Sequence, residues 1–164
     1  KKGRRMEELE QFALNDSMTG MYNRNAYDYF VKNEKDFEGY VIVTFDLNNL
    51  KQCNDQYGHR AGDEYIINAA HIIEDNFERY GKCYRIGGDE FCCIIPKGRY
   101  FKIERVMHKI DQDVEILNHK NIIPVPVGIA YGYAVFTADD TDPEKVRERA
   151  DKDMYRNKKA MKQS

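Results

Sequence analysis

Hydrophobic residues along this chain fall into short runs typical of strands and longer stretches with a helical period. Residues 40–45 are β-branched and aromatic without polar alternation, which predicts a central strand that is covered on both faces and ends at Asp46. Residues 83–86 and 91–95 predict two strands joined as a hairpin. Residues 125–135 predict a fourth strand, with Pro124 and Pro126 at its start, where a missing N–H donor is tolerated.

Five stretches carry apolar side chains at helical spacing. The first covers residues 1–15, and a short connector helix runs through Tyr27 and Phe30. Long helices are expected at residues 62–80 and from Ile103 to Leu117. The last helix begins at residues 142–143, where an aspartate N-cap is followed by proline in the first helical position.

This order of elements contains β-α-β-β-α-β, the split βαβ plan in which helices back one face of an antiparallel sheet. We therefore expect an α+β fold with a ferredoxin-like βαββαβ core, a central antiparallel sheet and flanking helices. A length of 164 residues and an apolar share of 41% suit one domain with a full core. We expect that domain at residues 16–164, with residues 1–15 linking it to an upstream domain absent from this sequence.

Composition excludes several classes of protein. A net charge of −2 argues against a general nucleic-acid-binding surface. No run approaches the roughly 20 apolar residues of a membrane span. The four cysteines have no metal-binding spacing, and three lie in strand-like runs that favour buried, reduced thiols and a cytosolic compartment. Because the first residue is Lys1 and not Met, we interpret the chain as a piece of a longer protein.

The most informative segment is residues 87–91, Gly-Gly-Asp-Glu-Phe. The two glycines predict a two-residue hairpin turn with positive φ, from which Asp89 and Glu90 project. In the predicted sheet the first strand neighbours this hairpin, so Asp46 joins them at one edge. Clustered carboxylates are costly without a cation, and Mg²⁺, with Mn²⁺ as a substitute, is the natural partner. The alternative is an ordinary hairpin with solvated acids.

Pleating sends neighbouring strand residues to opposite faces, so Asp89 and Glu90 need not share one task. One carboxylate can bind the ion while the other handles a proton.

Residues 47–51 pass from strand into helix, and their free backbone N–H groups with Lys51 form a phosphate-binding arrangement. In the last helix Lys158 and Lys162 lie one turn apart and can hold a triphosphate. The alternative for these two lysines is simply a favourable position near the negative end of the helix dipole.

Asn54 and Asp63 flank a short Tyr-Gly-His segment at residues 57–59. An amide with a carboxylate is the pair that guanine requires, because N1 and N2 of guanine donate while O6 accepts. The alternative is that Asn54 ends a helix and Asp63 caps the next.

Taken together these motifs resemble the GGDEF family of diguanylate cyclases over nearly the whole chain. The matching segments are Asp16 to Arg24, Phe45 to Asp63, Arg85 to Phe91 and, in the last helix, Asp151, Met154, Tyr155 and Lys158. The resemblance implies a fold related to nucleotidyl cyclase and polymerase palm domains.

The resemblance also implies that two GTP molecules, one held by each subunit of a homodimer, are joined into cyclic di-GMP with release of pyrophosphate. By resemblance, Mg²⁺ is held by Asp46, the Leu47 carbonyl and Asp89, and Glu90 activates the 3′-hydroxyl or holds a second ion. The implied catalytic residues are Asp89, Glu90 and Lys51. The implied guanine contacts are Asn54 and Asp63, and the implied phosphate contacts are Asn49, Leu50, Lys51, Lys158 and Lys162.

Three departures from the family pattern stand out. Asn48 replaces a frequent acid, and Lys162 stands where arginine is usual. Many members carry an Arg-x-x-Asp product-binding motif whose positions here are Glu78 and Gly81, with Arg79 out of register. We therefore expect no high-affinity product inhibition of that kind.

Two other functions compete with an active cyclase. A degenerate domain that binds GTP or a protein without catalysis is suggested by Asn48 and the missing product motif. A cyclase with another purine is disfavoured, because Asp63 suits guanine better than adenine. We expect a cytoplasmic domain whose full-length protein carries an upstream sensory or dimerising part and can be anchored in a membrane.

Overall fold

A computed structural model describes residues 13–99 and 101–163, with side chains as far as Met161. The helix expected at residues 1–15 lies outside the described residues except for its last three positions. The described elements are α2 (Arg24–Asn33), β1 (Val41–Leu47), α3 (Leu50–Tyr57), α4 (His59–Phe77), β2 (Lys82–Arg85), β3 (Glu90–Ile95), α5 (Ile103–His119), β4 (Ile129–Val135) and α6 (Pro143–Gln163).

The four strands form one antiparallel sheet in the order β2-β3-β1-β4. β1 is therefore central, between the hairpin and β4. In the register of the sheet Asp46 lies opposite Glu90 on β3 and opposite Ala130 on β4. The predicted βαββαβ plan and its antiparallel sheet are confirmed.

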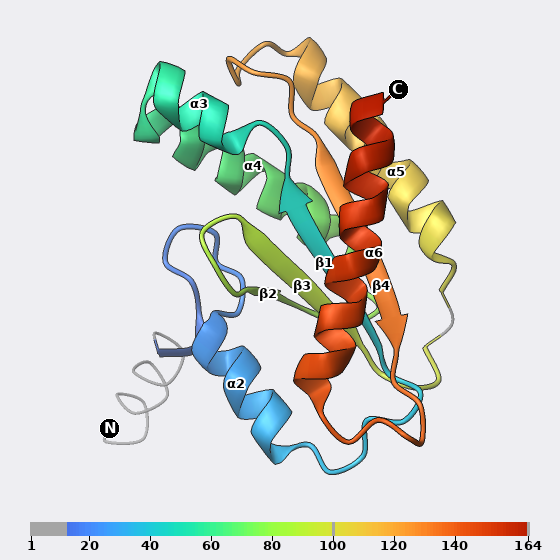
Figure 1. Cartoon of the computed structure of the whole chain (residues 1–164). Coiled ribbons are helices and arrows are strands. Elements are labelled where there is room, and N and C mark those ends of the chain that lie inside the picture. The colour runs from blue at the N-terminus through green and yellow to red at the C-terminus, as the bar shows by residue number, and fades with distance from the viewer. Residues whose placement is uncertain (1–12, 100, 164) are drawn as a thin grey trace.

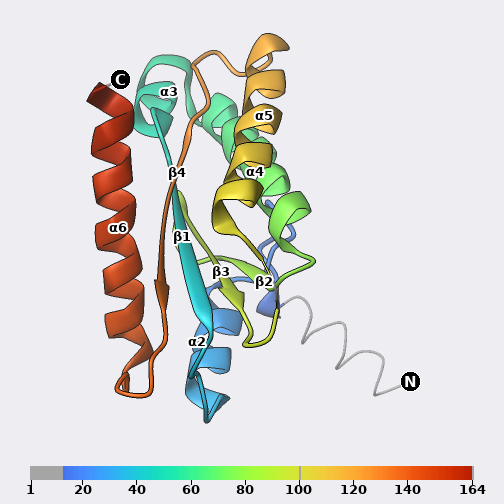
Figure 2. The same cartoon turned by 90° about the vertical axis from the view of Figure 1, so that its right-hand side faces the viewer.

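Helices cover both faces of this sheet (Figures 1 and 2). The two helices within the βαββαβ plan, α4 and α5, lie on one face, as predicted. The helices outside that plan, α2 and α6, cover the other face and pack against a second apolar cluster. The expectation that residues 40–45 form a strand covered on both sides is therefore also met.

The pleat of β1 divides its side chains between these two layers. Val43, Phe45 and Leu47 belong to the core with α4 and α5. Ile42 belongs to the cluster with α2 and α6. Asp46 shares this second side of the sheet, so the polar end of β1 faces α6.

Some helices and strands begin or end at other residues than predicted. The segment after β1 forms two helices, α3 and α4, separated at Gly58, which has φ of 90°. The predicted helix at residues 62–80 is thus α4 beginning at His59. β1 extends one residue past Asp46, and β4 begins only at Ile129 because residues 125–128 leave the sheet.

Candidate active site

Asp46 and Asp89 meet at the edge of the sheet where the hairpin turns. Asp46 stands near the end of β1, and one of its carboxylate oxygens, Oδ1, accepts the Leu47 N–H at 3.0 Å. Asp89 lies in the loop between β2 and β3. Partial burial, and then the charge of the neighbouring Asp46 carboxylate, raise the pKa of Asp89 above its ordinary value.

The hairpin loop differs from the predicted two-residue turn. β2 ends at Arg85 and β3 begins at Glu90, so four residues connect them. The backbone N–H groups of Ile86 and Gly87 both donate to the Glu90 carbonyl, at 3.0 and 3.3 Å. Neither Gly87 nor Gly88 has a positive φ, so that part of the prediction is wrong. A Cβ on Gly87 would lie 3.3 Å from the Glu90 side chain, so a glycine is favoured there because a larger residue would crowd Glu90.

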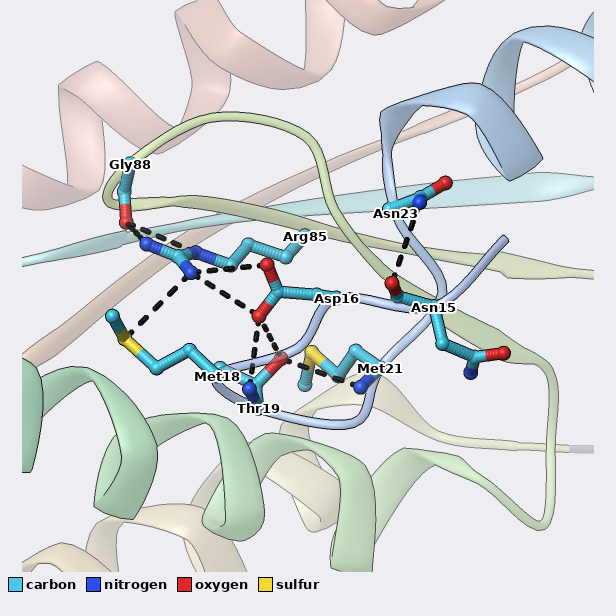
Figure 3. A network of polar contacts seen from close by, with 8 residues as sticks. All are labelled: Asn15, Asp16, Met18, Thr19, Met21, Asn23, Arg85 and Gly88. Atoms are coloured by element: carbon cyan, nitrogen blue, oxygen red, sulfur yellow. Dashed lines mark hydrogen bonds and ion pairs between the residues drawn. The ribbon is translucent and has the colours of Figure 1, made fainter. Parts of the chain in front are cut away.

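Arg85 fastens this loop to the segment before α2 (Figure 3). Its Nε and Nη2 donate to the Gly88 carbonyl at 3.2 and 2.9 Å, while Nη1 contacts both carboxylate oxygens of Asp16 at 3.1–3.2 Å. The same carboxylate accepts the N–H and the hydroxyl of Thr19. Burial alone would raise the pKa of Asp16, but the hydrogen bonds from Thr19 and Arg85 outweigh it and hold that pKa below its usual value.

A cavity of about 240 Å³ opens beside the acids, on the side of the sheet that faces α6. Both Asp89 and Glu90 line it, although pleating predicted opposite faces. The reason is that Asp89 lies in the loop, where strand alternation does not apply. The Glu90 side chain borders the cavity from an exposed position. The cavity is lined by Thr44, Phe45, Asp46, Ile86, Asp89, Glu90, Phe91, Asp151, Met154 and Tyr155.

These groups fit Mg²⁺ through two carboxylates. Among residues 13–99 and 101–163, no three His, Cys, Asp or Glu side chains are grouped as a ready metal cage. Asp46 and Asp89, with the carbonyl of Leu47 next in sequence, nonetheless match an ion that commonly takes one or two carboxylates and completes its shell with substrate phosphates and water.

Lys158, on α6, reaches this acid pair. Its Nζ lies 2.5 Å from Asp46 Oδ2, and the two side chains are only 23% and 18% exposed. The same ammonium group counteracts the rise in the pKa of Asp89. Lys158 was expected to contact phosphate, and it here neutralises a predicted metal ligand. The side chain of Lys162 lies outside the described residues.

The beginning of α3 stands directly after β1. Asn49 is the N-cap residue with φ of 66°, and its side chain makes no capping bond, instead donating to the Pro126 carbonyl. The first N–H groups of an α-helix have no partner within the helix, so those of Leu50 and Lys51 can receive an anion. The Lys51 side chain is exposed.

A buried tyrosine fixes this segment. The Tyr65 hydroxyl, on α4, donates to the carbonyls of Asn48 and Gly128 and accepts the Gly128 N–H at 3.0 Å. It thereby joins the end of β1 to the segment before β4.

Asn54 and Asp63 come from α3 and α4, the two helices that meet at Gly58. A Cβ on Gly62 would lie 1.7 Å from Asn54 Oδ1, so the asparagine amide rests against the backbone of the residue before Asp63. Asn54 lies inside α3 and Asp63 is the fifth residue of α4. Neither residue therefore has the capping role that was the alternative reading.

Sequence reasoning matched Asp151 to the family pattern of the last helix without giving it a role, and it did not place Thr44 at the site. Asp151 is half-buried on α6, and burial raises the pKa of its carboxyl although Thr44 and Arg147 act in the opposite direction. Its spacing of seven residues from Lys158, two helical turns on one face, is the signal that could have found it. Thr44 was hidden inside an otherwise apolar strand.

Comparisons with known proteins identify the family of this chain. The family model described as "Diguanylate cyclase, GGDEF domain" matches residues 13–164. The chain is 29% identical to diguanylate cyclase DgcS of Shewanella oneidensis, over 93% of this chain and 52% of that protein. It is 30% identical to the bifunctional diguanylate cyclase/phosphodiesterase MucR of Pseudomonas aeruginosa, over 90% of this chain and 22% of that protein.

Another relative, PdeR of Escherichia coli, is named a cyclic di-GMP phosphodiesterase and is 29% identical over 93% of this chain. The chain thus spans between 22% and 52% of the lengths of these curated relatives. None of the described helices is both long and apolar enough to cross a membrane.

Solved structures share the fold. The coiled coil and GGDEF domain of DgcB from Caulobacter crescentus, in complex with c-di-GMP, aligns with a TM-score of 0.78 and 24% identity, covering 96% of this chain and 86% of that one. Diguanylate cyclase SiaD of Pseudomonas aeruginosa, solved with its activator SiaC, aligns with a TM-score of 0.77 and 24% identity, over 97% of this chain and 64% of that one. The chain belongs to the GGDEF domain family.

Proposed function

We propose that this chain is the catalytic domain of a diguanylate cyclase, which condenses two GTP molecules into cyclic di-GMP and releases two pyrophosphates. The observation that carries the proposal is that Asp46 and Asp89 line one cavity, with Lys158 paired to Asp46. A fold does not retain two like charges close together without a cost to stability, so a divalent cation that binds with the substrate is the best reason for the arrangement.

The reaction forms two phosphodiester bonds. In each, the 3′-oxygen of one GTP attacks the α-phosphorus of the other, the bond from that phosphorus to the bridging oxygen of the β-phosphate breaks, and the 3′-hydroxyl proton leaves. Glu90 accepts that proton and passes it to solvent, because its exposed carboxylate borders the cavity where a facing subunit can present a nucleotide.

Asp46, the Leu47 carbonyl and Asp89 would hold Mg²⁺, which neutralises phosphate charge when bound. Phosphoryl transfer needs little else than position and charge from the protein. Lys51 and the first N–H groups of α3 hold the phosphates, since only two residues separate the end of β1 from this helix.

Guanine is selected by Asn54 and Asp63. The carboxylate of Asp63 accepts from N1 and N2 of the base, and the Asn54 amide donates to O6. The support for this assignment is their position on α3 and α4, where Asn54 rests against the backbone of Gly62 and lies about one helical turn after the phosphate-binding N-terminus of α3.

We propose further that the protein lacks the Arg-x-x-Asp mode of product inhibition. The position of its aspartate is Gly81, where a Cβ would lie 2.1 Å from the Ile94 carbonyl oxygen, so that no side chain fits there. Arg79 is directed over the ring of Tyr80 at 5.9 Å. Product titration that shows no inhibition at micromolar concentrations supports this proposal, and tight binding dependent on Arg79 contradicts it.

The test of the function is conversion of GTP to cyclic di-GMP with Mg²⁺, read by mass spectrometry at several protein concentrations. Specific activity should rise with protein concentration, because each subunit holds one GTP. Asp89→Asn should lower the rate at least about 100-fold, as loss of a main electrostatic group does. The matched control is Asp139→Asn, an exposed aspartate outside the site. An unchanged rate in Asp89→Asn would contradict the proposal.

A further inference from the structure

The ion pair of Lys158 with Asp46 has no step assigned to it in the proposed reaction. The proposed function gives Asp46 to a metal ion and the family resemblance gives Lys158 to a phosphate, yet the two side chains form an ion pair at 2.5 Å. The pair is largely shielded from solvent, so it is screened less than a surface pair. One carboxylate oxygen is thus already engaged by a positive charge.

No other basic side chain among the described residues forms an ion pair with Asp46 or Asp89. Arg85 is held by Asp16 and the Gly88 carbonyl on the other side of the loop. Arg147, also on α6, pairs with Glu144. The neutralisation of these two neighbouring carboxylates therefore depends on Lys158.

The backbone of α6 is fixed against the edge strand, so Lys158 can change partner only through its side chain. The Asn157 amide donates to the Tyr131 carbonyl at 2.7 Å, and the Tyr133 N–H donates to Asp153 at 3.0 Å. At Gly132 the backbone of α6 approaches so closely that a Cβ would lie 2.1 Å from the Met154 nitrogen. Four flexible methylene groups remain for the ammonium group to move.

An ammonium group and a divalent ion repel each other when both approach the same carboxylate oxygen. We propose that Lys158 is the counter-ion of Asp46 and Asp89 in the nucleotide-free protein, an inference that rests on the proposed function. A divalent cation and a nucleoside triphosphate together displace it, the cation taking the carboxylates and the phosphates taking the ammonium group.

This exchange makes the binding of metal and nucleotide cooperative. Metal alone has to remove Lys158 from Asp46 and leaves the ammonium group without a partner. With a triphosphate present, the released ammonium group gains a new anion, so each ligand strengthens the binding of the other by the same factor.

The test measures binding of Mn²⁺ alone to the nucleotide-free protein by electron paramagnetic resonance. Lys158→Met removes the competing charge and keeps a side chain of similar length. We expect Mn²⁺ to bind this variant on the order of tenfold more tightly than the wild type, with the tightening by a non-hydrolysable GTP analogue reduced by the same factor. Lys159→Met, the next residue and an exposed one, is the matched control and should change neither value.

An equal or weaker affinity of Lys158→Met for Mn²⁺ alone would overturn the proposal. Because that variant could fail to fold, a second measurement uses the wild type. Acylation of lysines followed by mass spectrometry should show Lys158 protected relative to Lys159 without metal, and more reactive after saturation with Mn²⁺ alone. Reactivity of Lys158 that does not change with Mn²⁺ would equally overturn it.

Failure of this inference is distinguishable from failure of the proposed function. If Asp89→Asn abolishes Mn²⁺ binding in the presence of the GTP analogue while Lys158→Met leaves binding of metal alone unchanged, the metal site stands and the counter-ion role falls. If Asp89→Asn binds Mn²⁺ and analogue as the wild type does, the metal site falls and the counter-ion proposal falls with it.

Discussion

The two faces of β1 are built for different purposes. The face toward α4 and α5 is apolar along its whole length, with Val43, Phe45 and Leu47 all 2% exposed or less. The face toward α6 begins with buried Ile42, becomes polar at Thr44 and ends in Asp46, which is partly exposed. One strand therefore supplies the core on one side and the site on the other, and pleating alone separates them.

The site on the polar face of β1 also contains side chains from a loop and from a helix. Asp89 comes from a loop that Arg85 holds, and Lys158 comes from a helix packed on β4. Changes on the apolar face should thus act on stability, while changes on the polar face should act on activity with smaller effects on stability.

The largest effect is expected for Phe45→Ala. Phe45 is 1% exposed and packs edge-on against Phe77 of α4 at a centroid distance of 5.2 Å. Its truncation should lower the free energy of unfolding by about 3–5 kcal/mol, measured by urea denaturation. Phe45→Leu, which fills most of the space, should cost less. Equal losses for both variants would argue against a close-packed core on this face.

A smaller loss is expected for Gly132→Ala, which disturbs the seat of α6. Its Cβ would meet the backbone of Met154 and Ala150 at 2.1 and 2.3 Å. The strain should lower the free energy of unfolding by about 1–3 kcal/mol and should reduce activity in addition, because α6 carries Lys158. The control is Gly88→Ala, where a Cβ meets nothing within 4 Å and stability should change by less than about 0.5 kcal/mol. Equal losses of stability in Gly132→Ala and Gly88→Ala would contradict the close approach of α6 to Gly132.

The smallest of these losses is expected for Asp16→Asn, at about 1–2 kcal/mol near neutral pH. The pKa of Asp16 is lowered in the folded protein, so its carboxylate stabilises the fold above the unfolded pKa of about 3.9. That contribution is lost as the pH falls through the folded pKa. Urea denaturation of wild type and variant between pH 7 and pH 3 should show the difference shrink toward acid. A difference independent of pH would argue against the ion pair with Arg85.

Much of the fold could be predicted because it depends on local patterns. The apolar run of β1 and the helical spacing from Ile103 to Leu117 lead directly to elements in the structure. The break between α3 and α4 could not be placed, because apolar spacing does not show that Gly58 takes φ of 90°. The length of the hairpin loop was predicted wrongly because a Gly-Gly pair fits a two-residue turn as readily as a four-residue loop.

The site could be predicted only in part. Asp46, Asp89 and Glu90 follow from the neighbouring strands of the plan, and a family motif leads to Asn54 and Asp63. The pairing of Lys158 with Asp46 joins residues 112 positions apart, and it depends on where α6 crosses the sheet. A local sequence pattern does not predict such a long-range pairing.

In the proposed function, Asp46 and Asp89 are kept together because a metal–nucleotide complex binds there. The most direct test is thermal melting of wild type and Asp89→Asn, each with and without Mg²⁺ and a non-hydrolysable GTP analogue. Without ligands the variant should melt at the same temperature or higher, because it loses a partly buried charge beside Asp46. With ligands the wild type should gain stability and the variant should not. Equal stabilisation of both proteins by the ligands would contradict the account.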